Sequence, residues 1–156
     1  MFRTSLARVA GPMRRAAAVA DGDAGTKLNF SLLLPHKPVY DNALVDQVTI
    51  PGATGVLGVL KGHMKTMASL QAGVLSVQND GVTETFFVSG GFAFVEGDRA
   101  MVAAVEAVSI DDLDAASVEK GLTAATQALA TANDEGNAEA QAAVDTHRAM
   151  QYALSL

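Results

Sequence analysis

The sequence contains no cysteine, and this absence excludes two kinds of site. Without thiols there is neither a disulfide framework nor a thiolate metal centre. The only histidines, His36, His63 and His147, fall in three separate segments without the spacing of metal ligands. No apolar run approaches the ~20 residues that cross a bilayer. We therefore expect no direct membrane insertion, and any membrane association must come through a partner.

Groupings of residues that carry catalysis are also missing. No nucleophile lies in a recognisable arrangement with a base. Gly52, Gly55 and Gly58 are evenly spaced, but the Lys-Ser/Thr pair of a phosphate-binding loop does not follow them. The sequence thus predicts no catalytic residue, no metal ion and no cofactor.

Basic charge is scarce outside the first twenty residues. Residues 1–20 hold four arginines and no acid, and removing them leaves 7 basic and 17 acidic side chains, a net charge of −10. Such a balance argues against nucleic acid or an anionic membrane surface as the partner of the body. The partner should be neutral or basic.

The basic N-terminal segment has the pattern of a targeting peptide. Phe2, Leu6, Val9 and Met13 fall on one stripe of a helix, and the arginines lie largely off it. This amphipathic pattern predicts a mitochondrial transit peptide over residues 1–20, although a disordered basic arm has the same composition. Residues 21–26 are expected to form a linker.

The next eighty residues have the pattern of a sheet. Leu28, Phe30, Leu32 and Leu34 follow a period of two, with the polar Asn29 and Ser31 between them, as in a strand with one buried face. Asn79-Asp80-Gly81 predicts a hairpin turn. Further short strands follow, with a bend or bulge expected at residues 41–42 and a sharp bend at residues 90–91. No helical pattern intervenes, so residues 27–106 are predicted to form an antiparallel β-sandwich or flattened barrel.

Two features of this sheet carry specific expectations. Pro51-Gly52 suits the centre of a type II turn, which would open a compact, weakly charged loop presenting mainly backbone. The phenylalanines are expected in the core rather than on a base-stacking platform, because no lysine or arginine is interleaved with them. They are Phe86, Phe87, Phe92 and Phe94.

The period changes to that of a helix from residue 111. Leu122, Ala125 and Leu129 belong to one helical stripe, and a second helix is predicted over residues 138–154. Ser109 or Asp111 could cap the first helix. The aspartates at residues 111, 112 and 114 could also form a carboxylate cluster, but helix caps are the commoner use. Residues 109–156 are therefore predicted to form a C-terminal antiparallel α-helical hairpin, less stable than the sandwich because alanine buries little area.

Three stretches, in order, resemble one known family. Residues 55–63 look like a G-x-L-G element ending in Gly-His, residues 87–95 like an apolar strand that passes through Ser-Gly-Gly into another, and residues 104–114 like a sheet-to-hairpin junction. All three are similar to the small rotor-stalk subunit of F-type ATP synthases, called delta in mitochondria and epsilon in bacteria. The resemblance covers residues 27 to 156.

The resemblance implies a place in an assembly. In that family the sandwich binds the central-stalk gamma subunit and rests on the ring of c subunits, and in mitochondria a small epsilon subunit packs against it. One copy would lie peripherally at the matrix side of the inner membrane. The stretch Ala53, Thr54, Gly55, Val56, Leu57 and Gly58 matches the ring-facing element, and His63 matches the region that faces gamma.

Two positions depart from bacterial relatives. Val56 stands where many of them have an acid, which puts a charged ring contact there in doubt. Ser117 stands where an ATP-binding motif at the start of the hairpin has arginine, so phosphate charge has no matched donor. We expect no nucleotide sensing and little self-inhibition.

The function predicted from these observations is that of a non-catalytic rotor subunit of the mitochondrial proton-translocating ATP synthase. It would couple rotation of the c-ring to the gamma subunit by rigid docking, without making or breaking bonds. The alternative is a free-standing β-sandwich ligand-binding module with a regulatory helical tail, which would purify alone and bind a small molecule.

Overall fold

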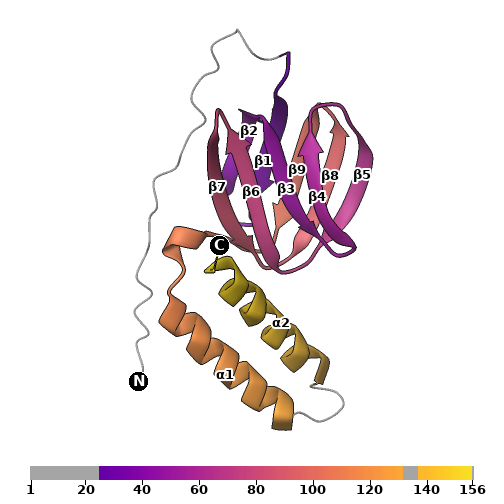
Figure 1. Cartoon of the computed structure of the whole chain (residues 1–156). Coiled ribbons are helices and arrows are strands. Elements are labelled where there is room, and N and C mark those ends of the chain that lie inside the picture. Colours follow the sequence, from indigo (N-terminus) through magenta and orange to yellow (C-terminus); the bar gives the residue numbers. More distant parts are fainter. Residues whose placement is uncertain (1–24, 132–136, 156) are drawn as a thin grey trace.

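A sandwich of ten strands is followed by two helices in the computed structural model, which describes residues 25–131 and 137–155 (Figure 1). This arrangement confirms the predicted fold class. The predicted transit peptide over residues 1–20, and residues 21–24 of the predicted linker, lie outside the described residues.

The strands form one continuous pairing network that folds over into the sandwich. Its order is β10-β7-β6-β3-β5-β8-β9-β1-β2, with β4 paired to β3 outside this path. The strands are β1 Leu28–Leu33, β2 Pro38–Val45, β3 Gln47–Gly52, β4 Gly55–Leu60, β5 His63–Leu70, β6 Gly73–Asn79, β7 Val82–Val88, β8 Gly91–Gly97, β9 Arg99–Ala104 and β10 Ala107–Ser109.

The alternation predicted for the first strand is confirmed. Leu28, Phe30 and Leu32 of β1 are fully buried, while the residues between them are partly exposed. Phe30 lies against the ring of Tyr40 on β2, with a centroid separation of 5.6 Å. Tyr40 in turn donates a hydrogen bond to the Glu84 carboxylate on β7. The core thus lies between the layers and is closed at this side by an aromatic contact and a polar one.

The predicted hairpin turn at residues 79–81 and the predicted bulge at residues 41–42 are confirmed. Asp80 and Gly81 have positive φ angles of 52° and 78°, and Asn79 pairs with Val82 across the turn. These values fit the two-residue hairpin that the Asn-Asp-Gly sequence predicts. Asn42 has a φ of 50° where the pairing of β1 with β2 shifts register, which makes the predicted bulge.

Two features of the sheet do not follow from the sequence pattern. β1 pairs with β9 in parallel, whereas an entirely antiparallel sheet is predicted. No hairpin joins these strands, so their relative direction is not fixed by a local turn. β10 is three residues long and pairs with β7. The sheet therefore continues beyond residue 106, where the predicted sandwich domain ends, and reaches the first residue of the predicted hairpin domain.

A buried lysine ties three loops together at the start of β1. The Lys27 ammonium donates to Asn79 Oδ1 at 2.8 Å and Asp80 Oδ1 at 2.6 Å, and its Nζ lies 3.7 Å from an Asp46 oxygen. Asp46 also accepts a hydrogen bond from the backbone N–H of Asp80. Because this cluster joins the entry to β1, the β2–β3 link and the β6–β7 turn, it fixes one end of the sandwich.

The helical part begins later than predicted. A short 3-10 turn, η1 Ile110–Asp112, precedes α1 Ala115–Thr131, and α2 Asn137–Ala153 returns antiparallel to it (Figure 1). α2 packs against β6, whereas α1 packs mainly against α2. Across the described residues, neither helix is long and apolar enough to span a membrane.

The two helices approach closely at one glycine. A Cβ added to Gly121 of α1 would lie 2.3 Å from Nε2 of His147 on α2. The other ring nitrogen of His147 lies 2.8 Å from the Ala143 carbonyl oxygen, one turn earlier. Val118, Ala125, Val144 and Ala153 are the buried helix residues. The large side chain of Tyr152 is exposed, so small side chains supply most of the contact and the hairpin buries little apolar area.

Candidate functional site

The stretch predicted as an interface forms a β-hairpin rather than a loop. Gly52 of β3 pairs with Gly55 of β4, and only Ala53 and Thr54 make the turn between them. The predicted type II turn at Pro51-Gly52 is therefore wrong, since both residues belong to β3. Glycine is required on both sides of this tip: a Cβ at Gly52 would lie 2.7 Å from the Gly55 carbonyl oxygen, and Gly55 has a φ of 138°.

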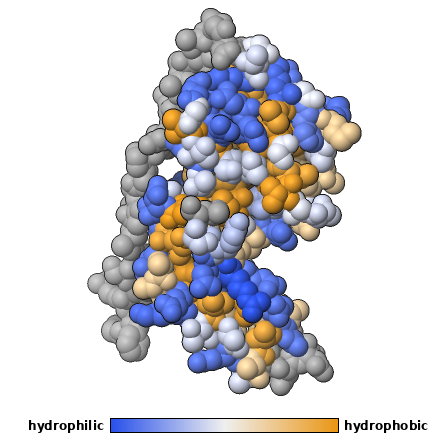
Figure 2. All heavy atoms as spheres, viewed as in Figure 1, coloured by the Kyte–Doolittle hydropathy of each residue, from blue (hydrophilic) through white to orange (hydrophobic). Residues whose placement is uncertain are grey.

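The tip of this hairpin is well exposed. Ala53, Thr54, Gly55 and Gly58 are exposed, and Val56 retains 71% of its accessible surface. Leu57 differs, because it is half-buried and packs against the core. Figure 2 shows hydrophobic atoms over the β3–β4 hairpin and where the sandwich meets the helices. An uncharged, apolar tip of this kind is suited to protein contact. Residue 56 is a valine and not an acid, so it adds no charge to the tip.

His63 lies apart from the tip. It is the first residue of β5, opposite Gly97, and the six residues of β4 separate it from the turn at Ala53 and Thr54. At about 3.3 Å per residue, that strand spans roughly 20 Å. The His63 ring is half-buried, and its Nδ1 lies 2.9 Å from the Met64 carbonyl oxygen. The predicted interface residues therefore occupy two opposite ends of the sandwich and do not form one site.

A second apolar surface lies on the outer face of β5, β8 and β9. Met67, Phe94 and Met101 are register partners in adjacent strands, and each side chain is exposed. Phe92 extends the row on the same face of β8, with 55% of its surface accessible. We call Met67, Phe92, Phe94 and Met101 the outer ladder. Four large apolar side chains gathered on one solvent-facing surface are typical of a protein interface.

The outer ladder corrects the expectation that all four phenylalanines are core residues. Phe87 is buried and Phe86 packs against the core, but Phe92 and Phe94 face outward while Ala93 and Val95 fill the interior. Alternation alone could not decide the direction, because both sets of residues are apolar. The parity of Glu96 could have decided it, since a glutamate belongs on the solvent side and shares its face with Phe92 and Phe94.

An exposed ion pair borders the outer ladder. Lys65 Nζ lies 2.5 Å from Glu96 Oε1. This hydrogen bond, together with the charge of the glutamate, raises the pKa of Lys65, and the lysine in turn lowers the pKa of Glu96. Both groups therefore stay charged at neutral pH. An exposed ion pair contributes little to stability. Lys65 and Glu96 place charged groups at the edge of the outer ladder.

The start of α1 is built as a helix cap. The Asp114 carboxylate accepts hydrogen bonds from the backbone N–H groups of Ala116 and Ser117, each at 3.2 Å, and from the Ser117 hydroxyl at 2.5 Å. The cap is therefore Asp114, one of the three aspartates for which a capping role was favoured, and not Ser109 or Asp111. Ser117 is engaged in this cap through both its backbone N–H and its hydroxyl. Among the described residues, no group of three or more acids and histidines is placed to hold a metal ion.

This cap predicts a pH dependence of the hairpin. The hydrogen bonds from Ser117 and Ala116 lower the pKa of Asp114 in the folded chain. The stabilisation is then fully present above the pKa of the unfolded chain, about 3.9, and is lost as the pH falls through the lowered folded value. Far-UV circular dichroism follows the helix content during acid titration. Asp114→Asn keeps a capping side chain but has no carboxylate to protonate, so it should lack the part of the acid-induced helix loss that Asp114 causes. Identical titrations of the two proteins would contradict the assignment.

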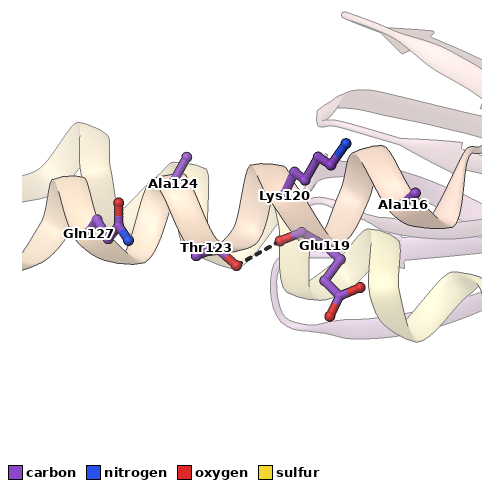
Figure 3. A pocket seen from close by; sticks show the side chains of 6 residues that line it. All are labelled: Ala116, Glu119, Lys120, Thr123, Ala124 and Gln127. Carbon is purple, nitrogen blue, oxygen red and sulfur yellow. Dashed lines mark hydrogen bonds between the residues drawn. The ribbon is translucent and has the colours of Figure 1, made fainter.

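A shallow depression on α1 has no features of a ligand site. It is lined by Ala116, Glu119, Lys120, Thr123, Ala124 and Gln127. Figure 3 shows these side chains spread along a single helix, where the Thr123 hydroxyl bonds back to the Glu119 carbonyl oxygen at 3.0 Å. The side chains do not converge on a common point, so the depression offers no arrangement for chemistry.

Comparison with known proteins relates most of the chain to one group. Residues 27–110 match the family model of the ATP synthase delta/epsilon chain, β-sandwich domain. The mitochondrial ATP synthase subunit delta' of Ipomoea batatas is 46% identical over 83% of this chain and 66% of its own length. The subunit delta of Yarrowia lipolytica is 36% identical over 97% of this chain and 98% of its own length.

A solved structure agrees with these sequence relatives. A chain of the Euglena gracilis mitochondrial ATP synthase, from a structure that includes the c-ring, matches with a TM-score of 0.79 and 25% identity. The match covers 92% of this chain and 89% of that one. The likeness therefore includes the helices as well as the sandwich.

Proposed function

The chain belongs to the delta/epsilon family of ATP synthase subunits, which are non-catalytic components of the synthase, and from this premise we propose that it couples c-ring rotation to the gamma subunit. Its work is transmission of torque by rigid docking during ATP synthesis, with no bond made or broken. The observation that carries the proposal is that the likeness to mitochondrial delta subunits extends along almost the whole chain.

Two of the partners in this proposal correspond to described surfaces. The tip from Ala53 to Gly58 meets the c-ring through backbone and the exposed Val56. Gamma lies on the outer face of β5, β8 and β9, because His63, which resembles a gamma-facing position, shares β5 with Met67 of the outer ladder. The mitochondrial epsilon subunit packs against the same protein. One copy sits peripherally at the matrix side of the inner membrane, held there through the complex.

The rigidity that torque transmission needs is supported by the sandwich. Three features make the sandwich stiff. They are its fully buried core, the Lys27 cluster at one end and the Tyr40–Glu84 contact across the layers. The helical hairpin buries less and is the softer part. The shallow depression on α1 does not favour the alternative of a ligand-binding module, because a ligand pocket encloses its ligand with side chains from several elements.

The test of this proposal is purification of the tagged full chain from mitochondria in mild detergent. We expect gamma, c and epsilon subunits to be recovered with one copy of the tagged chain per complex. A tagged unrelated matrix protein serves as the control for adventitious capture. Recovery of the chain as a free monomer, with no synthase subunit, would contradict the proposed function.

A further inference from the structure

β4 is bordered by a strand on one side only. It pairs with β3 along its full length, from Gly52↔Gly55 to Gln47↔Leu60, and no other described strand pairs with it. Val56 and Leu60, on its outer face, retain 71% and 52% of their accessible surface, and Gly58 between them is also exposed. Figure 1 shows β4 beside β3 at the front of the sandwich.

The register identifies the backbone groups that point away from β3. Gly52 and Gly55 close a two-residue turn, so they form a hydrogen-bonded pair, and every second pair after it, at Leu57 and at Val59, is hydrogen-bonded as well. Pro51, opposite Val56, has no N–H to offer β4, and its carbonyl oxygen accepts from the Gln71 N–H at 3.1 Å on the other side. The N–H and C=O groups of Val56, Gly58 and Leu60 therefore face the open edge.

The two strands that end the pairing order, β10 and β2, are protected, and β4 is not. Proteins guard exposed edges with proline, charge, bulges or short length. β2 carries Pro38, Asp41 and the bulge at Asn42, and β10 is only three residues long. β4 has six residues without proline or charge, and its register with β3 is unbroken.

We propose that the open edge of β4 binds an extended segment of a neighbouring synthase subunit. This segment adds to the sheet as a further strand and is neutral or basic in composition. The unpaired backbone row specifies the conformation of the occupant, because only another strand satisfies donors and acceptors at this spacing. Charge specifies its composition: the body carries a net −10, so a second copy would bring two acidic bodies together. The inference rests on the proposed function, since it takes the partner from the same assembly.

Hydrogen exchange of the full chain provides the first test. In the isolated chain, the amides of Val56, Gly58 and Leu60 should exchange fast, while those of Leu57 and Val59, bonded to β3, exchange slowly. In the purified synthase the first three should slow by about tenfold or more. Unchanged fast exchange in the synthase would overturn the proposal. Protection that appears in the isolated chain and grows with its concentration would overturn it in favour of a second copy.

A matched pair of variants provides the second test. Gly58→Pro removes an outward N–H and keeps the bonds to β3, whereas Gly58→Ala adds only a Cβ, which would meet Gln47 at an ordinary 3.6 Å. Each variant is co-expressed with a differently tagged wild-type chain, and their ratio is measured in the purified synthase. We expect about tenfold exclusion of the proline variant and a clearly smaller exclusion of the alanine variant, which keeps the outward N–H.

The outcomes of the competition separate the two proposals. Equal incorporation of wild type and both variants would overturn the added strand while leaving the subunit role intact. Absence of the wild-type chain itself from the synthase would overturn both. If the proline variant fails to fold, as circular dichroism would show, the exchange measurement on the wild-type chain still decides.

Discussion

Gly91→Ala is expected to lower the free energy of unfolding by about 4 kcal/mol, from backbone strain and overpacking together. Gly91 opens β8 with a φ of 143°, a conformation that side chains rarely adopt. A Cβ there would lie 2.1 Å from the Ala103 carbonyl oxygen and 2.9 Å from the Ala104 Cα. Both atoms are backbone of the paired strand β9, so no side-chain rotation can relieve the clash.

Urea denaturation of the full chain measures this effect, and Gly97→Ala is its control. Gly97 also has a positive φ, 58°, but a Cβ there would meet nothing within 4 Å. The control should cost only about 1 kcal/mol, the penalty of a left-handed backbone. Equal losses for the two variants would mean that conformation alone, and not the contact with β9, explains the glycine.

The difference between what could and could not be predicted lies in how local the determining information is. The β6–β7 turn was predictable because Asn79, Asp80 and Gly81 themselves tolerate the positive φ angles that it needs. β1 was predictable because Asn29 and Ser31 alternate with large apolar residues, which leaves only one orientation. The parallel pairing of β1 with β9 was not, since it depends on strands far apart in the sequence.

The interface role of residues 53–58 stays a prediction. Most of these residues are exposed, but Leu57 is half-buried, and Pro51-Gly52 is in a strand because pairing of β3 with both β4 and β5 overrides its turn propensity. The outer ladder was missed because β8 is apolar on both faces. The assignment of Asp114 as the cap also needed the structure, since several aspartates precede the helix and only the hydrogen bonds distinguish them.

Phe94→Asp is expected to reduce incorporation into the synthase about thirtyfold, because residues at the centre of an interface carry most of its binding energy. Phe94 lies in the middle of the outer ladder, between Met67 and Met101, with 41% of its surface accessible in the isolated chain. A carboxylate at this position would be desolvated in the proposed interface with gamma, and no basic residue is its direct partner across β5 or β9. Competition against a differently tagged wild-type chain measures the incorporated ratio.

The controls for Phe94→Asp separate docking from folding. Val82→Asp introduces the same charge at an exposed strand residue on β7, outside the outer ladder, and should incorporate like the wild type. Both variants should unfold in urea within about 1 kcal/mol of the wild type. Phe94→Leu keeps the apolar character and should lose little. Incorporation of Phe94→Asp at the level of Val82→Asp would exclude the outer ladder from the interface, because a carboxylate buried against gamma should lower incorporation.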